Sequence, residues 1–565
     1  MADETNHALC RTAIYSNDYY DFIIDYRGGY PREDTACFQK VSDRFDVVCY
    51  DRSASPEMSL ETYPYAIIPK CYAPADQTAL ETGGILRLQN PAGLDLTGQG
   101  VLVGFLDTGI EYTHSAFRYA DGSTRIAAIW DQTEKDGEPP EGFSYGAFYG
   151  REMIDAALAS ENPAALVPTV DAYGHGTFLA GVACGSADAA ADFTGAAPMA
   201  ELLVVKCKEA KPYLREYYFV PEDVPCYQEN DLMLALSWLL HMADRLQKPL
   251  VVCIGMGTAM GNHAGEDAFS AFCDEVGRQR QRVVVTCAGN EANARHHYFR
   301  SGLAENDTEA VEISVGQGVT GFSMECWAAV PEIYRVTVLS PTGERFAAVG
   351  GMAGGQSHRF LFEQTTVTVE YVVAGFGLGS QLICLRFFAP WPGIWTLELT
   401  AALAIEGAFH CWLPQTGLMS GEVFFLQPDP DTTILSPGMS AAAVSAGACH
   451  TAGGGIWADS GRGYSVSGTV KPDILAPGVN VYGPGLRGGY TGRTGTSVSA
   501  ALTAGGCALI LQWAVLRQGM AWMNSTDLSN LLIRGAVRSA DRIYPNRAYG
   551  YGQLDVYGAL EALRV

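Results

Sequence analysis

Short apolar segments separated by helical patterns constrain the fold of this chain more than any other feature. They cover residues 101–106, 202–206, 250–254 and 283–286, and helical patterns at residues 231–246 and 266–280 lie between the last three. A strand that is apolar at nearly every position is buried on both faces, as parallel strands of α/β proteins are. The sequence therefore predicts an α/β fold with a parallel sheet covered by helices on both faces.

The segments around this pattern have a different character. Short β-like runs at residues 20–26, 46–51 and 65–69 predict a small α+β unit at the start. Residues 305–429 lack a long helical pattern and carry β-like runs between Gly and Pro turns, which predicts an all-β sandwich or jelly roll. Helical patterns return at residues 440–448, 497–516 and 525–537. We therefore expect four segments: 1–76, 77–304, 305–429 and 430–565.

Composition and charge exclude several classes of protein. The chain has 37 Lys and Arg against 62 Asp and Glu, and a net charge of −25 would repel a nucleic acid. No run of 18 apolar residues occurs, and no basic segment followed by an apolar one opens the chain, so we expect neither a membrane span nor a secretory signal. The 15 scattered cysteines form no metal-ligand spacing, which favours free thiols in a reducing compartment and no metal site.

Four motifs carry groups suited to nucleophilic catalysis. They are Asp107-Thr108-Gly109 after the first apolar segment, Gly174-His175-Gly176-Thr177, Ala288-Gly289-Asn290, and Gly495-Thr496-Ser497-Val498-Ser499-Ala500. A serine hydroxyl becomes a nucleophile when a histidine takes its proton, and a carboxylate orients that histidine. Ser497 at a helix start offers a free backbone N–H, and Asn290 offers an amide; two such donors form an oxyanion hole.

An aspartic protease is the alternative interpretation of the first motif. Asp459-Ser460-Gly461 would supply the second carboxylate that this chemistry needs. This interpretation leaves the histidine and serine motifs without a role, and the residues before Asp459 are a poor strand context. We therefore favour the serine mechanism.

The order Asp107, His175, Ser497 with these flanking residues resembles the subtilisin-like serine proteases (subtilases). Lys471-Pro-Asp-Ile-Leu-Ala-Pro-Gly478 matches the same family, and the resemblance covers about residues 77–304 and 430–565. It implies a serine endopeptidase that acts on protein substrates and needs no cofactor. It also places Gly257, Cys287, Ala288 and Gly289 in the substrate-binding site. The chain departs from the family at Phe178, where many members have histidine, and at Gly255-Met256, where Ser-Leu is usual.

A narrower group resembles the chain more closely, namely the clostridial subtilases that include the spore-germination (Csp) proteases. The motifs are Trp130-Asp131-Gln132, the segment 214–223 and the segment 227–231. This resemblance implies that residues 1–76 are a propeptide, a chaperone and inhibitor released by self-cleavage within residues 70–80. It also implies a jelly-roll insert, limited proteolysis of a proenzyme in spore germination, and a cytoplasmic or spore-associated location.

Several features remain open at this point. His296-His297 could be a metal pair, but neighbouring residues of an extended loop point in opposite directions, so we expect a solvated loop. Tyr217, Tyr218 and Phe219 either contact substrate or pack over residues 231–246. Asp188 and Asp192 could hold a structural calcium ion, to which we assign no site. The rival functions are a non-catalytic subtilase scaffold that senses a partner and a broad-specificity intracellular protease.

Overall fold

The computed structural model describes residues 18–25, 38–40, 45–56, 78–89, 93–143, 145–349, 355–373 and 380–563. The chain divides into two compact units, Met1–Pro74 and Ala75–Val565.

The described part of the first unit contains a three-stranded antiparallel sheet with the order β1-β3-β2. Its strands are β1 (Tyr19–Asp25), β2 (Phe38–Lys40) and β3 (Phe45–Asp51). A short 3₁₀ helix, Arg52–Ala54, follows β3 and is capped by the Asp51 carboxylate, which accepts from the Ser53 N–H at 2.8 Å. The expected β-like run at residues 65–69 and most of the expected cleavage segment, 70–77, lie outside the described residues.

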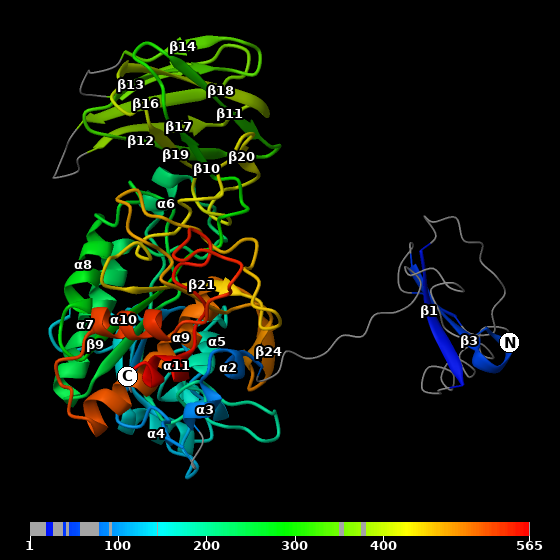
Figure 1. Ribbon diagram of the computed structural model, residues 1–565, viewed down its shortest axis with the longest axis vertical. Helices are drawn as coiled ribbons and strands as arrows, with labels where there is room; N and C mark the ends of the chain where they lie inside the picture. The colour runs from blue at the N-terminus through cyan, green and yellow to red at the C-terminus, as the bar shows by residue number, and fades with distance from the viewer. Residues whose placement is uncertain are drawn as a thin grey trace. The chain divides into compact units, whose positions relative to one another are not determined.

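The second unit is built around an eight-stranded sheet (Figure 1). Neighbouring strands are parallel except β6, which pairs antiparallel with β5 at one edge. The apolar segments predicted from the sequence form β4, β7, β8 and β9. In spatial order the strands are β22 (Ile474–Pro477), β21 (Val444–Cys449), β9 (Arg282–Cys287), β8 (Leu250–Ile254), β4 (Leu102–Asp107), β7 (Glu201–Lys206), β5 (Ile126–Asp131) and β6 (Ala147–Gly150).

Helices cover both faces of this sheet, which explains why its strands are apolar throughout. On β4, Val103 and Phe105 belong to the core that also contains residues of α5 (His175–Cys184) and α9 (Thr496–Leu511), whereas Leu102 and Leu106 belong to the core with α7 (Glu229–Leu246) and α8 (Ala268–Gly277). The helices are α2 (Thr78–Thr82), α3 (Leu86–Gln89), α4 (Arg151–Ala159), α5 (His175–Cys184), α6 (Pro212–Tyr218), α7 (Glu229–Leu246), α8 (Ala268–Gly277), α9 (Thr496–Leu511), α10 (Ser525–Gly535) and α11 (Val556–Glu561).

The prediction of a helix at residues 440–448 is wrong. That segment contains β21, a fully buried strand that pairs in parallel with β9 on one side and β22 on the other. Its run of Ala, Ser and Gly has no helical or strand periodicity, and alanine favours helices. Pairing with two neighbouring strands overrides that propensity.

One helix has the length and apolarity of a membrane span. It runs from Thr496 to Arg517, where α9 continues into a π-helical segment, Gln512–Arg517. The protein buries 89% of its most apolar window. In the part of the chain that the structure describes, this helix is therefore a core helix of the sheet domain.

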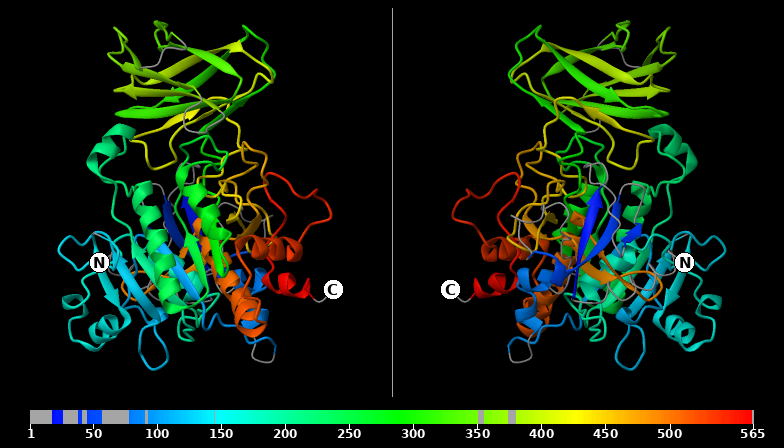
Figure 2. Two further views of the ribbon diagram at one scale, coloured as in Figure 1. Left: turned by 90° about the vertical axis from the view of Figure 1, so that its left-hand side faces the viewer. Right: turned by 90° about the vertical axis from the view of Figure 1, so that its right-hand side faces the viewer.

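The β-rich segment folds into two antiparallel sheets that share one apolar core (Figures 1 and 2). Burial alternates along its strands, for example in β17, because one face of each sheet points inward. One sheet has the order β10 (His297–Arg300), β19 (Phe409–Trp412), β12 (Gly321–Ala329), β17 (Ser380–Phe388), β16 (Thr366–Val373) and β15 (Gly355–Arg359); the other has β14 (Arg345–Ala347), β13 (Ile333–Leu339), β18 (Gly393–Leu403), β11 (Thr308–Val315) and β20 (Val423–Phe425). Its first strand, β10, precedes residue 305, the expected start of the insert.

Candidate active site

Asp107 and His175 meet at the carboxyl edge of the sheet. Asp107 is the last residue of β4 and is 1% exposed, and His175 is the first residue of α5. The His175 Nδ1 atom lies 2.8 Å from Oδ1 and 3.0 Å from Oδ2 of Asp107. Gly174, before the helix, has a φ of +71°, which favours glycine. A carboxylate on Nδ1 fixes the tautomer in which Nε2 can accept a proton.

Ser497 completes this arrangement from the far end of the sequence. It lies in the first turn of α9, and its Oγ atom is 3.1 Å from Nε2 of His175. The first N–H groups of a helix have no partner within the helix, so the backbone N–H of Ser497 can donate a hydrogen bond to a negatively charged oxygen. Asp107, His175 and Ser497 therefore form one hydrogen-bonded chain.

Asn290 faces the same point. Its side-chain Oδ1 accepts from the backbone N–H of Thr496 at 3.1 Å and from the Thr496 hydroxyl at 2.9 Å. This leaves the Nδ2 amide group available as a donor. A β-carbon added at Gly495 would lie 3.3 Å from Ser497 Oγ and 3.7 Å from Asn290 Nδ2, so these two groups flank one small space. A side chain at residue 495 would extend into that space.

Burial and charge act in opposite directions on His175. Burial lowers its pKa, but the charge of Asp107 and the hydrogen bond to it raise the pKa by more. Arg493 lowers the pKa of His175 and Asp171 raises it, both through charge. The net result is a pKa above the ordinary 6.5, so the imidazolium is stabilised.

The sequence motifs missed a second carboxylate behind the first. The Oδ1 atom of Asp171 accepts from the Thr108 hydroxyl at 2.8 Å and from the Gly174 N–H at 2.8 Å. Its Oδ2 atom accepts from the N–H of Thr177 at 2.9 Å. Asp171 therefore ties the strand that ends in Asp107 to the start of the helix that carries His175. Its position four residues before His175, with Thr177 after it, is the only signal that the sequence gives.

Glycines let the backbone segments of this site approach one another. A β-carbon at Gly176 would lie 2.2 Å from the carbonyl oxygen of Gly109. One at Gly255 would lie 2.4 Å from Leu179 Cδ1 and 3.3 Å from His175 Cε1. The departure from serine at Gly255 therefore accompanies a leucine at residue 179 that fills the space a β-carbon would need.

The four expected substrate-binding residues lie on two segments beside this site. Gly257 follows β8, and Cys287, Ala288 and Gly289 run from the end of β9 to Asn290. The Gly289 N–H donates to the Thr496 hydroxyl at 2.9 Å. Burial raises the pKa of the Cys287 thiol to about 12, so this thiol stays protonated and is no rival nucleophile.

The motifs of the narrower resemblance have structural contacts. Asp131 accepts from the Thr169 hydroxyl at 2.6 Å, and Gln132 donates to the backbone oxygen of Asp231 at 3.1 Å. The Arg386 guanidinium lies 4.5 Å from the Tyr217 ring, and the Phe219 and Phe388 rings are 4.9 Å apart. Tyr217, near the end of α6, and Phe219, the residue after it, therefore pack against β17 of the insert.

The prediction of a solvated loop at His296-His297 is wrong. His297 lies in β10, is 1% exposed and stacks on Trp412 with ring centroids 4.9 Å apart. Its Nε2 atom is 2.9 Å from Nδ1 of His410, and His263 stacks on Trp412 at 4.1 Å. We call His263, His297, His410 and Trp412 the histidine stack. Because His263 belongs to the sheet domain and the other three to the insert, the stack lies at the junction of the two.

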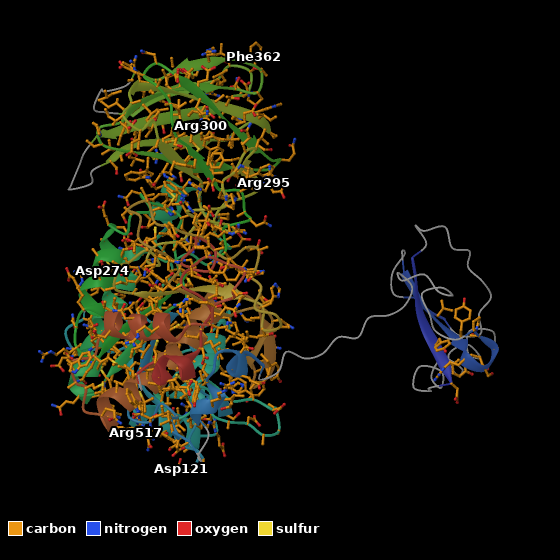
Figure 3. All side chains as sticks on the ribbon, viewed as in Figure 1. Asp121, Asp274, Arg295, Arg300, Phe362 and Arg517 are labelled. Carbon is orange, nitrogen blue, oxygen red and sulfur yellow. The ribbon has the colours of Figure 1, made fainter. Side chains whose placement is uncertain are left out.

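Arg295, labelled in Figure 3, lies at the same junction, and its guanidinium is 3.6 Å from the centre of the Phe424 ring. At Asp188, one carboxylate oxygen accepts from the Tyr490 hydroxyl at 2.9 Å and the other from the N–H of Ala190 at 3.0 Å. Hydrogen bonds thus occupy the carboxylate considered for calcium. Within the described ranges, no group of three or more His, Cys, Asp or Glu could hold a metal ion.

Comparisons with known proteins agree with this geometry. The sequence model of the subtilase family matches residues 98–323 and 426–552, more than half of the chain, and the gap lies inside the insert. The structure is similar to that of the Clostridium perfringens CspB protease, with 28% identity and a TM-score of 0.75 over 86% of this chain and 99% of that chain.

Two other solved structures are less similar. Sphericase is 16% identical, with a TM-score of 0.42 over 84% of this chain and 97% of its own. The psychrophilic protease S41 is 17% identical, with a TM-score of 0.42 over 86% and 100%. No protein with a curated description matches the chain.

Proposed function

This chain belongs to the subtilase family and is a serine endopeptidase, and we propose that it cleaves peptide bonds with Ser497 as nucleophile, His175 as general base and acid, and Asp107 as the group that orients His175. The observation that carries this proposal is the hydrogen-bonded chain, with 2.8 Å between Asp107 and His175 and 3.1 Å between His175 and Ser497. The chemistry requires no cofactor.

The steps follow from these positions. The Ser497 Oγ atom attacks the scissile carbonyl while its proton passes to Nε2 of His175. The oxyanion that forms accepts hydrogen bonds from the Ser497 N–H and the Asn290 Nδ2 amide. The imidazolium, stabilised by Asp107, gives its proton to the leaving amine, and the C–N bond breaks. A water molecule then loses a proton to His175 and attacks the acyl-enzyme, which releases the acid and restores Ser497.

The proposal includes self-cleavage of the first unit as a propeptide. The boundary between the compact units falls between Pro74 and Ala75, inside the expected cleavage segment 70–80. Ala79 and Leu80 are only 3% and 4% exposed and belong to the core of the second unit, so cleavage before Thr78 would leave that core intact. We expect the released propeptide to inhibit the protease.

Intact-mass measurement tests self-cleavage. Purified wild-type protein should carry a break before Thr78, and Ser497→Ala protein should remain a single chain near 60.6 kDa. Ser499→Ala is a matched control, because Ser499 lies two residues away and donates to the Ala476 backbone oxygen at 2.9 Å. A wild-type protein without any break near these residues would contradict the proposal.

The proposed physiological role is limited proteolysis of a proenzyme, as in spore germination, by a spore-associated or cytoplasmic enzyme. The similarity to the Clostridium perfringens CspB protease supports this role. The two-sheet insert, which we propose to be of the jelly-roll type, fits the same group. Comparing the proteins that are processed with and without the enzyme tests the role. One proenzyme would support it, and many unrelated products would favour a broad-specificity protease.

A further inference from the structure

We propose that Leu435 occupies the pocket that receives the substrate side chain on the amino side of the scissile bond, so that this protease cleaves after small residues. This inference rests on the proposed function and adds to it the class of substrate. The short segment that follows the insert, residues 434–438, forms backbone hydrogen bonds with Ala288 and Thr258, which belong to or adjoin the two substrate-binding segments.

The substrate side chain next to the reacting carbonyl must lie between those segments. When its carbonyl oxygen lies between the Ser497 N–H and the Asn290 amide, the neighbouring side chain lies beside Gly289, the residue before Asn290. The opposite wall is the segment after β8, since a β-carbon at Gly255 would lie 3.3 Å from His175 Cε1. Gly257, two residues further, is on the same side of that extended segment.

Leu435 already fills the space between these two glycines. A β-carbon added at Gly289 would lie 2.3 Å from Leu435 Cγ and 2.7 Å from its Cδ1. A β-carbon added at Gly257 would lie 2.8 Å from Leu435 Cβ. The leucine is 6% exposed and therefore packs against both walls. A bulky substrate side chain would have to occupy the same volume.

The backbone around Leu435 is held on both sides, so the leucine cannot withdraw easily. Its N–H donates to the Ala288 oxygen at 2.9 Å. Ser436 and Thr258 exchange two backbone hydrogen bonds of 3.0 Å, which pair this segment with the chain after Gly257. The Ser436 hydroxyl donates to Asp267 at 2.7 Å. These bonds fix the leucine between the two walls.

The chemistry that fits the remaining space is a glycine, alanine or serine before the scissile bond. A side chain of leucine, phenylalanine or tyrosine would collide with Leu435. Each methylene group that a substrate side chain gains or loses in an apolar pocket changes kcat/KM by roughly 10- to 200-fold. Shortening Leu435 should therefore admit larger side chains.

The test is a peptide library in which only the residue before the scissile bond varies, with cleavage products identified by mass spectrometry. Wild-type protein should cleave after glycine, alanine and serine and not after leucine, phenylalanine or tyrosine. Leu435→Gly should raise cleavage after the large residues roughly 10- to 100-fold relative to alanine. Leu435→Ala should raise it less. Ile434→Ala, the matched control in the neighbouring buried position, should keep the wild-type profile.

Two results would overturn the inference. One is wild-type cleavage after phenylalanine or tyrosine as fast as after alanine, a result that needs no variant to fold. The other is an unchanged profile in a Leu435→Gly protein whose Ser497 still reacts with a fluorophosphonate. A folded wild-type protein that cleaves no peptide and does not react with the fluorophosphonate would instead remove the proposed function, and this inference with it.

Discussion

The sheet domain and the β insert bury their strands in different ways, and only the first creates a reactive edge. Parallel strands of the sheet domain all end on one side, so Asp107 after β4, Asn290 after β9 and the starts of α5 and α9 converge there. Strands of the insert alternate in direction and share one core. Residues hundreds of positions apart in the sequence therefore meet at the edge of the sheet where the parallel strands end.

The strand-end site at His175 and the histidine stack at the insert junction shift histidine pKa values in opposite directions. Asp107 raises the pKa of His175, so the protein stabilises its charged form. Burial lowers the pKa of His263 to about 4 and that of His410 to about 3, and it lowers the pKa of His297 well below the ordinary value, so the protein stabilises their neutral forms. The predictions below test this contrast.

The largest expected effect comes from Ser497, the proposed nucleophile. Ser497→Ala should lower kcat by about 10⁴- to 10⁶-fold with little change in the unfolding transition, because the hydroxyl acts in chemistry and not in packing. The measurement is peptide hydrolysis together with urea unfolding. Phe362→Ser, a substitution on the insert at a side chain that is 77% exposed (Figure 3), should keep wild-type kcat. Residual activity of Ser497→Ala near that of wild type would place the chemistry elsewhere.

Asn290→Ala should lower kcat by about 10²- to 10³-fold, since one of two oxyanion donors is lost. KM should change much less, because the donor acts mainly when charge develops on the carbonyl oxygen. Steady-state kinetics on one peptide separates the two constants. An equal loss in Asn290→Ala and in Ser497→Ala would mean that Asn290 holds the site together through Thr496.

Acid should destabilise the insert junction. A histidine whose folded pKa lies below 6.5 contributes stability that is complete above pH 6.5 and is lost as pH falls through the folded pKa. For His263, with a pKa of about 4, the loss is on the order of 3 kcal/mol. The charges that face the stack, Asp267 near His263 and Arg547 near His410, act in opposite directions.

The measurement is the free energy of unfolding between pH 7 and pH 4, followed by the fluorescence of the stacked Trp412. His263→Phe should reduce the pH dependence and keep the aromatic contact. His175 should contribute with the opposite sign, since its raised pKa gives stability below pH 6.5 that is lost as pH rises through the folded pKa. An unfolding free energy that is flat from pH 7 to 4 would contradict the proposed burial of neutral histidines.

The smallest expected effect is a shift in the pH profile. Arg493 donates to the Tyr173 backbone oxygen at 3.2 Å, and its charge lowers the pKa of His175. Arg493→Gln should therefore raise that pKa and move the acidic limb of kcat/KM to higher pH, because His175 must be neutral to act as base. Arg517→Gln, which lies away from the site and contacts the Leu94 and Asp95 backbone, is the charge-matched control. A limb displaced to lower pH would contradict the assignment.

Much of the sheet domain follows from the sequence because its strands are apolar runs that end in distinctive motifs. The structure brings Asp107, His175, Ser497 and Asn290 together, as the motif order leads one to expect. The strand β21 could not be predicted, since its small residues carry no period and its pairing with β9 and β22 is non-local.

Contacts between segments that are distant in the sequence could not be predicted either. His297 looks like a polar loop residue until pairing with β19 places it against Trp412. Asp171 and Leu435 belong to no motif, and their roles arise because the chain folds them against Thr108 and Gly289 respectively. Burial of this kind depends on which distant segments come together, and no local pattern records it.

Reaction of the folded protein with a fluorophosphonate, followed by peptide mapping of the adduct, tests directly whether Ser497 is the nucleophile. We expect one adduct, on Ser497, that is absent from folded His175→Ala protein. No adduct in folded wild-type protein, or an adduct on a residue other than Ser497, would contradict this expectation.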